Sequence, residues 1–113
     1  MSMREIKFRV WQKFGEYMMN YDSLTKEDGN VLSLLNDKRF YIPMQYTGLK
    51  DKNGVEIYEG DIVDYGAFDL SVIKYENSTF WARVGQYPLN VVHRDIEVKG
   101  NIYEHPELLG DSK

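Results

Sequence analysis

Two glycine-centred corners in the middle of the chain constrain its fold more than any other feature of the sequence. At the first corner, Asn53-Gly54 supplies two residues that tolerate positive φ, which a primed hairpin turn requires. At the second, Gly60 can adopt a backbone conformation closed to other residues, and the neighbouring Asp61 carboxylate can accept backbone donors. Together the corners predict a tight hairpin followed by a sharp bend into a new strand.

Alternation of apolar and polar side chains predicts strands before these corners. Ile6, Phe8 and Val10 fall on one face of the first extended segment, and residues 40–46 alternate in the same way. Phe14-Gly15 is predicted to turn the chain back into a second strand over residues 16–21, which makes a two-stranded ribbon. Pro43 has no N–H for a ladder hydrogen bond, so we expect its strand to lie at an edge or to carry a bulge.

Short strands separated by turn residues account for most of the remaining chain. They are predicted over residues 31–35, 61–65, 70–75, 79–84 and 96–99. This spacing, with almost no helical periodicity, predicts an all-β fold of the small-barrel or sandwich kind. Pro106 suits the first turn of a short C-terminal helical segment, and we expect Leu108 and Leu109 to plug one end of a barrel.

The composition excludes several classes of function. The 113 residues include no cysteine, which excludes disulfides, thiolate metal sites and cysteine nucleophiles. The formal net charge of −4 disfavours generic nucleic-acid binding, which relies on a basic surplus. The N-terminal residues form no apolar signal segment and no run approaches the length of a membrane span, so we expect a cytoplasmic protein without a membrane partner.

Three segments of the chain together resemble the YopX family of phage and prophage proteins. The central one reads Met-Gln-Tyr-Thr-Gly-Leu-Lys-Asp-Lys-Asn-Gly over 44–54 and continues as Ile-Tyr-Glu-Gly-Asp-Ile-Val over 57–63. The closing one reads Gly-Asn-Ile-Tyr-Glu-His-Pro-Glu-Leu-Leu over 100–109, and the opening one reads Arg-Glu-Ile-Lys-Phe-Arg-Val-Trp over 4–11. His105 departs from the family pattern, because a small polar residue such as Asn is more usual there.

The resemblance implies an SH3-like barrel in the C-terminal part and an origin in a phage, a prophage or its bacterial host. We therefore expect a small N-terminal β-ribbon subdomain over residues 1–46 and the SH3-like barrel over 47–113. No established activity comes with the family, so no catalytic residues carry over, and likeness of fold alone assigns no function. The residues expected to serve the fold itself are Gly48, Asp51, Asn53, Gly54, Gly60, Asp61, Gly100 and Asn101.

Carboxylates and histidines are the remaining candidates for chemistry, and each has a plainer explanation. Four carboxylates lie within residues 56–64, close enough for an acid–base pair or a cation site, although a bend and a solvated hairpin also account for them. These are Glu56, Glu59, Asp61 and Asp64. His93 and His105 would need a carboxylate to complete a metal site, and their spacing is not diagnostic. We predict no catalytic site, no metal site and no cofactor, and hence no enzyme.

The N-terminal ribbon carries the first candidate binding surface, on the face opposite its core. Its residues are Trp11, Tyr17, Met19 and Tyr21. Clustered aromatics with Met are typical of interfaces, although coverage by the barrel of the same subunit explains them equally well. Because a two-stranded ribbon does not persist alone in water, we expect a homo-oligomer that uses this surface.

One face of the barrel carries the second candidate surface. Its residues are Tyr65, Phe80, Trp81 and Arg83. Aromatics interleaved with basic residues could stack bases or grip a peptide, whereas the plainer explanation puts at least half of them in the core. We predict a non-enzymatic interaction or accessory module with an unknown protein partner. The alternative is a single-stranded nucleic-acid binder that uses these aromatics with Lys74, Arg83 and Arg94.

Overall fold

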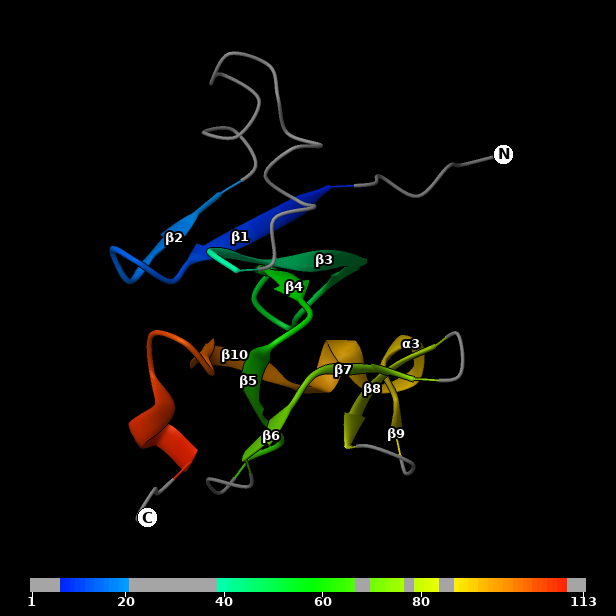
Figure 1. Ribbon diagram of the computed structural model, residues 1–113. Helices are drawn as coiled ribbons and strands as arrows, with labels where there is room; N and C mark the ends of the chain where they lie inside the picture. Colours follow the sequence, from blue (N-terminus) through cyan, green and yellow to red (C-terminus); the bar gives the residue numbers. More distant parts are fainter. Residues whose placement is uncertain (1–6, 21–38, 67–69, 77–78, 84–86, 110–113) are drawn as a thin grey trace. The chain divides into compact units, whose positions relative to one another are not determined.

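The computed structural model of the chain consists mostly of β-strands, which confirms that the fold is a β fold (Figure 1). The structure describes residues 7–20, 39–66, 70–76, 79–83 and 87–109. Contacts divide the chain into two compact units, Met1–Tyr46 and Thr47–Lys113, which we call the N-terminal unit and the C-terminal unit. The expected strand at 31–35 lies outside the described residues.

The N-terminal unit is built on an antiparallel sheet in the order β2-β1-β3. Its strands are β1 (Phe8–Gln12), β2 (Tyr17–Met19) and the first part of β3 (Tyr41–Lys50). Val10 lies opposite Met19 on one side and opposite Pro43 on the other. Val10 is fully buried, so the alternation in the first segment does place an apolar residue at the centre of the sheet.

Pro43 lies in the part of β3 that pairs with β1, several residues before the part that pairs with β4 in the hairpin, which agrees with the predicted edge position and not with a bulge. The register between β1 and β3 runs without a shift, and the three residues of β4 lie beside the end of β3 that precedes the hairpin turn. The Tyr46 N–H donates to the Lys7 carbonyl at 2.9 Å. Bonded pairs repeat at every second residue of an antiparallel ladder, so the Val10–Pro43 pair exchanges no hydrogen bonds. The proline is tolerated because its nitrogen points away from β1.

The hairpin between β3 and β4 (Glu56–Tyr58) turns through a three-residue connection instead of the primed two-residue turn predicted from Asn53-Gly54. The Gly54 N–H donates to the Asp51 carbonyl at 3.0 Å, and the Asp51 N–H donates to the Val55 carbonyl at 2.8 Å. Gly54 has φ of 83°, whereas Asn53 is not among the described residues with positive φ. This geometry matches an ordinary turn followed by one left-handed glycine.

The first sheet of the C-terminal unit has the order β10-β5-β6. It contains β5 (Asp61–Asp64), β6 (Leu70–Val72) and β10 (Glu97–Asn101), all antiparallel. The strand predicted over 70–75 is interrupted at Ile73, whose backbone exchanges hydrogen bonds with the Gly60-Asp61 bend at 2.9 Å. The bend therefore binds the residue that links β6 of this sheet to β7 of the next sheet.

The second sheet of the C-terminal unit has the order β7-β8-β9. It contains β7 (Lys74–Glu76), β8 (Thr79–Arg83) and β9 (Tyr87–Pro88). The short helix α3 (Leu89–Val92) and the 3-10 turn η1 (His93–Asp95) follow β9, and the sequence pattern did not predict them. A four-residue helix spans little more than one turn, too short to show helical periodicity.

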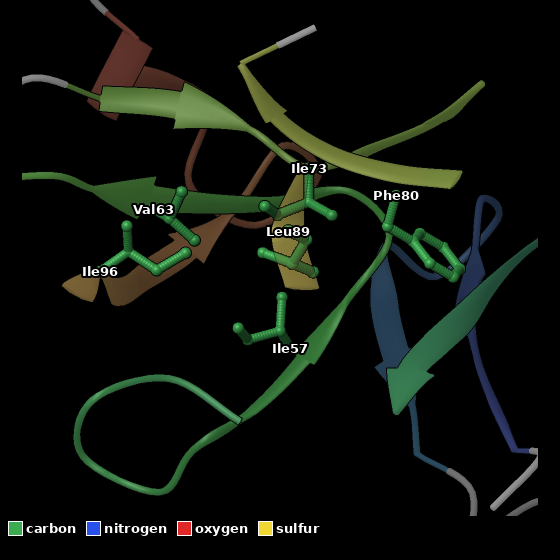
Figure 2. Packing of buried hydrophobic residues seen from close by; sticks show 6 residues of the cluster. All are labelled: Ile57, Val63, Ile73, Phe80, Leu89 and Ile96. Carbon is green, nitrogen blue, oxygen red and sulfur yellow. The ribbon is translucent and has the colours of Figure 1, made fainter. Parts of the chain in front are cut away.

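The core of the C-terminal unit takes side chains from β4, β5, β8 and α3, and from two residues that lie between elements. Figure 2 shows Ile57, Val63, Ile73, Phe80, Leu89 and Ile96, each at most 6% exposed. Burial of each such side chain contributes about 1.5–3 kcal/mol. The C-terminal 3-10 turn η2 (Pro106–Leu109) begins at Pro106 as expected, but Leu109 is 47% exposed and plugs nothing. None of the described helices is long and apolar enough to cross a membrane.

Candidate interaction surface

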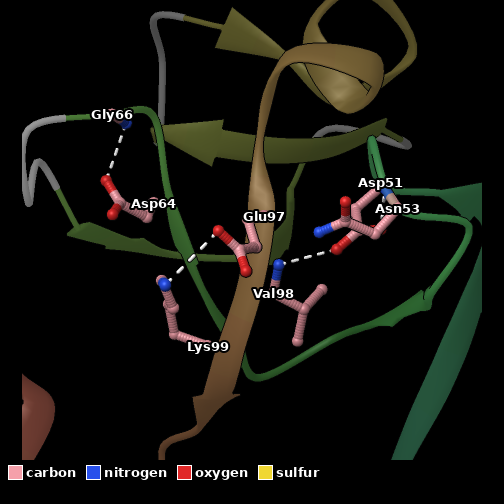
Figure 3. Close-up of polar contacts among 7 residues, drawn as sticks. All are labelled: Asp51, Asn53, Asp64, Gly66, Glu97, Val98 and Lys99. Atoms are coloured by element: carbon pink, nitrogen blue, oxygen red, sulfur yellow. Dashed lines mark hydrogen bonds and ion pairs between the residues drawn. The ribbon is translucent and has the colours of Figure 1, made fainter.

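The Asp51 carboxylate binds three backbone N–H groups and joins two distant parts of the C-terminal unit. Its Oδ1 accepts from Asn53 at 2.8 Å and from Val55 at 2.9 Å. Its Oδ2 accepts from Val98 at 2.8 Å, as Figure 3 shows. The side chain is only 5% exposed. Hydrogen bonds to an ionised acceptor are about twice as strong as neutral ones. Asp51 therefore fastens the hairpin turn to β10 and has little capacity left for chemistry.

Asp61 performs the same task at the second corner. Its Oδ2 accepts the Tyr58 N–H at 2.7 Å, and the residue is 1% exposed. Gly60 has φ of 89°, a left-handed conformation that favours glycine. The carboxylate that could have served as an acid or a metal ligand is therefore occupied by the bend that it stabilises.

Asn101 organises the C-terminal segment around a close approach between Gly100 and His105. The Asn101 Oδ1 accepts from Tyr103 at 3.0 Å and from Glu104 at 2.8 Å. The Asn101 N–H donates to His105 Nδ1 at 3.2 Å. A Cβ on Gly100 would lie 2.6 Å from the same nitrogen, so only glycine leaves room for the imidazole. His105, a candidate metal ligand, is used here to fold the segment.

His93 and Asp64, two further candidate ligands, also contact the backbone. The His93 Nδ1 donates to the Lys50 carbonyl at 2.7 Å, and Asp64 accepts from the Gly66 N–H at 2.7 Å. Lys99 pairs with Glu97 at 3.3 Å, as Figure 3 shows. Within the part of the chain that the structure describes, no group of three His, Asp or Glu side chains could hold a metal ion.

The predicted ligand face of the barrel is divided between two sides of β8. Phe80 is 6% exposed and belongs to the core, and Tyr65 packs against that core. Trp81 is half-buried, and its Nε1 donates to the Glu76 carbonyl at 3.0 Å. Successive side chains of a strand point to opposite faces, so Phe80 and Trp81 do not share one surface. Arg83 is the last residue of β8.

The predicted interface of the ribbon is divided in the same way. Trp11 lies opposite Met18, while Tyr17 lies opposite Gln12 on the other face of the hairpin. Met19 lies opposite the buried Val10 and so shares that face with Tyr17. The length of the connection between two strands sets their register, and a shift of one residue exchanges the faces. Tyr21 lies outside the described residues.

An exposed aromatic cluster at the end of the N-terminal sheet was not predicted as a surface. The Phe14 ring is 78% exposed and lies 5.4 Å from the Phe40 ring, at an angle of 58°. Tyr17 is 50% exposed and lies against Gly15, where a Cβ would come within 2.7 Å of its ring. We call this cluster the aromatic tip. It comprises Lys13, Phe14, Tyr17, Arg39 and Phe40.

The aromatic tip forms because the first turn meets the start of β3. The Lys13 N–H donates to the Phe40 carbonyl at 2.8 Å, which brings the two phenyl rings together. The Arg39 guanidinium lies 5.2 Å from the centre of the Phe40 ring, within the range of a cation–π interaction. The signal in the sequence was Phe14 itself, a large apolar residue inside a predicted turn.

Comparison with known proteins places the whole described fold in one family. The YopX protein family matches residues 7–110. The crystal structure of protein EF1440 from Enterococcus faecalis is similar, with 30% sequence identity and a TM-score of 0.68. The similarity covers 95% of this chain and 99% of that protein's chain. None of the curated proteins compared with the chain matches it.

Proposed function

This protein belongs to the YopX family, and from that premise we propose that it is a non-enzymatic interaction module that self-associates through the aromatic tip. The observation that carries the proposal is the 78% exposure of Phe14, whose ring lies 5.4 Å from the Phe40 ring, with Tyr17 50% exposed three residues further along the chain. Aromatic side chains gain the most from burial, and clusters of them on a surface are typical of protein contacts. Association would remove these rings from water.

The proposal of a non-enzymatic role is supported by how the polar side chains are used. Asp51, Asp61 and Asn101 are at most 5% exposed, and each binds backbone N–H groups of its own unit. A catalytic acid or base must reach a substrate proton with a free oxygen or nitrogen. Groups enclosed by the backbone suit a structural role better than a catalytic one.

The finer parts of the proposal are the ones that the resemblance to the family led us to expect. An SH3-like barrel over residues 47–113 is compatible with the two small antiparallel sheets around one core. Origin in a phage or prophage, and action in the cytoplasm of the bacterial host, remain expectations of the same kind.

A single-stranded nucleic-acid binder is the competing proposal. Trp81 lies opposite Lys74 on neighbouring strands, which supports it, because a ring beside a cation can stack a base near a phosphate. The burial of Phe80 weighs against it, since that ring has no surface left for a base. Trp81 and Lys74 alone would make a smaller binding surface than the five residues of the aromatic tip.

Sedimentation velocity over a range of protein concentrations tests the proposed self-association. We expect the mass of the wild type to rise above that of the protomer, and the Phe14→Ser and Tyr17→Ser double variant to remain monomeric. Val91→Ser is the matched control, because it removes another side chain that is 67% exposed but lies on α3. A wild type that stays monomeric at the highest concentration refutes the proposal. Salt-dependent retention on an oligonucleotide would favour the competing one.

A further inference from the structure

The turn between β3 and β4 contains the one asparagine of the chain that precedes a glycine. The sequence has seven Asn residues, and only Asn53 is followed by Gly. Asn53 and Gly54 are both exposed, and a Cβ built on Gly54 would meet no atom within 4 Å. Among the described residues, no hydrogen bond holds the Asn53 side-chain amide. The carbon of that amide is therefore accessible and is not fixed in place.

An Asn followed by Gly can lose its side-chain amide without an enzyme, because glycine has no side chain to obstruct ring closure. A base in water removes the proton of the Gly54 N–H, and the nitrogen bonds to Asn53 Cγ. The bond from Cγ to Nδ2 breaks, and Nδ2 gains a proton from water and leaves as ammonia. Water then opens the succinimide ring at one of its two carbonyl carbons. The product is Asp or, where the chain continues through Cγ, isoaspartate.

The closed turn opposes this reaction through Asp51. The Gly54 N–H donates to the Asp51 carbonyl at 3.0 Å, so a base reaches its proton only when this bond opens. The Asp51 Oδ1 accepts from the N–H groups of Asn53 at 2.8 Å and Val55 at 2.9 Å, which fixes the backbone on both sides of the reacting nitrogen. The carboxylate also adds negative charge beside a nitrogen that must become an anion. The rate therefore depends on how often the turn opens.

We infer that Asn53 is a site of spontaneous deamidation in the folded protein, and that the Asp51 carboxylate limits its rate. The inference goes beyond the proposed function and does not depend on self-association. It gives the Asn53-Gly54 pair a chemical consequence in addition to its place in the hairpin turn.

Deamidation at this turn should also affect β10. The Lys52 N–H donates to the Ile96 carbonyl at 3.0 Å, and the Asp51 Oδ2 accepts from the Val98 N–H at 2.8 Å (Figure 3). Isoaspartate adds a carbon to the backbone between the two N–H groups that Asp51 Oδ1 binds, and it places a second carboxylate near the first. A changed spacing and like charges both oppose these hydrogen bonds. The turn should therefore hold β10 less firmly after the reaction.

Incubation of the full-length protein in mildly alkaline buffer, followed by mass spectrometry of its peptides, tests the site. We expect NH2 to be replaced by OH at Asn53 before any other Asn, with both Asp and isoaspartate as products. Asn101 is the internal control, because it is 4% exposed and its Oδ1 accepts two N–H groups. Asn53→Gln should not react, since its longer side chain does not close the same ring. An unchanged Asn53 in the folded protein overturns the inference, and so does earlier reaction at another Asn.

The same measurement in guanidinium chloride tests whether the turn protects the site. The unfolded wild type should deamidate at Asn53 at least about tenfold faster than the folded wild type, because the Gly54 N–H is then open to base. Equal rates in the folded and the unfolded chain would show that the turn gives no protection, and they would overturn the part assigned to Asp51.

Asp51→Ala tests the carboxylate itself. This variant should deamidate at least about tenfold faster than the wild type, because two N–H groups of the turn lose their acceptor. Asp64→Ala is the matched control, since it removes a carboxylate that accepts the Gly66 N–H at another turn, and it should react at the wild-type rate. Asp51→Asn keeps an oxygen acceptor and should lie between, which serves if circular dichroism shows Asp51→Ala to be unfolded. Equal rates in the Asp51 variants and Asp64→Ala overturn the inference.

The isoaspartate form, separated by chromatography, shows whether the change reaches β10. Its urea midpoint should lie below that of Asn53→Asp, which carries the same charge on a normal backbone. The Val98 N–H should also exchange faster in the isoaspartate form, because its acceptor is held less firmly. An isoaspartate form that matches Asn53→Asp in both measurements contradicts the expected effect on β10.

Discussion

Two regions of this protein, the corners of the C-terminal unit and the aromatic tip of the N-terminal unit, use their polar and aromatic residues in opposite ways. In the C-terminal unit, polar side chains such as Asp51 and Asp61 are buried and bound to the backbone, while Phe80 completes an apolar core. In the N-terminal unit, the rings of Phe14 and Tyr17 are exposed at the end of a small sheet. Carboxylates that could have been catalytic therefore stabilise the fold of the C-terminal unit. Aromatic rings, which are usual in a protein core, are exposed on the surface of the N-terminal unit.

This contrast shows why residue type alone misleads about function in a small β protein. A carboxylate in a tight corner gains several backbone donors at once, which makes it more valuable to the fold than to a reaction. A ring in a turn has no sheet above it to cover it. The place of a residue relative to the turns of the chain therefore predicts its role better than the chemical type of its side chain does. The following substitutions test each side of this contrast.

Replacing Phe80 with Ala should have the largest effect on stability. The ring is 6% exposed within the core, so its removal is expected to lower the free energy of unfolding by about 3–5 kcal/mol. Urea denaturation followed by circular dichroism measures the change. Tyr75→Ala is the control, since this ring contacts Phe80 at 4.8 Å but is 49% exposed, and should cost about 1 kcal/mol. Equal costs would show that Phe80 is not a core residue.

Replacing Asp51 with Ala should cost nearly as much, about 3 kcal/mol, because three backbone N–H groups lose a charged acceptor. The same denaturation experiment checks it. Asp64→Ala removes the single hydrogen bond to Gly66 at an exposed turn and should cost less than about 1 kcal/mol. If Asp51→Ala is as mild as Asp64→Ala, the turn does not depend on the buried carboxylate.

Gly100→Ala should destabilise the C-terminal unit by about 1–3 kcal/mol through steric conflict. The added Cβ would lie 2.6 Å from His105 Nδ1 and 2.7 Å from its Cγ. In a double-mutant cycle with His105→Ala, the two costs should not add, because removal of the imidazole also removes the conflict. Strict additivity would mean that the close approach does not explain the need for glycine.

The smallest effect concerns the turn of the N-terminal unit. Glu16 has φ of 57°, a left-handed conformation that is unfavourable for residues with a Cβ. Glu16→Gly should therefore raise the free energy of unfolding by up to about 1 kcal/mol, as judged from the urea midpoint. Lys13→Gly, at a position without positive φ, should instead lower it. If Glu16→Gly lowered the free energy of unfolding and Lys13→Gly raised it, the turn geometry would be contradicted.

Local sequence patterns predicted the corners well but not the details that tertiary contacts decide. Gly60 and Asp61 behave as their chemistry suggests, because a bend is fixed by residues next to one another. Asn53-Gly54 formed a different turn, since the Asp51 carboxylate holds the Asn53 N–H and Val98 of a distant strand at once. No local pattern reports that second contact. The family resemblance, which spans the chain, was confirmed.

The candidate surfaces were harder to predict because they depend on strand register. Phe80 and Trp81 are adjacent in sequence and therefore lie on opposite faces of β8, which alternation alone could have shown. The separation of Trp11 from Tyr17 depends on the length of the first turn, which the sequence did not define. The pairing of Phe14 with Phe40 joins residues far apart in the chain, and only the structure brings them together.

Amide hydrogen exchange at low and at high protein concentration tests the central contrast most directly. We predict that amides bound to Asp51, those of Asn53, Val55 and Val98, exchange slowly at both concentrations. Amides of residues 13–17 and 39–40 should exchange more slowly at high protein concentration than in dilute solution, because copies associate through the aromatic tip. Protection at the aromatic tip that does not change with concentration, or rapid exchange around Asp51, would contradict the account.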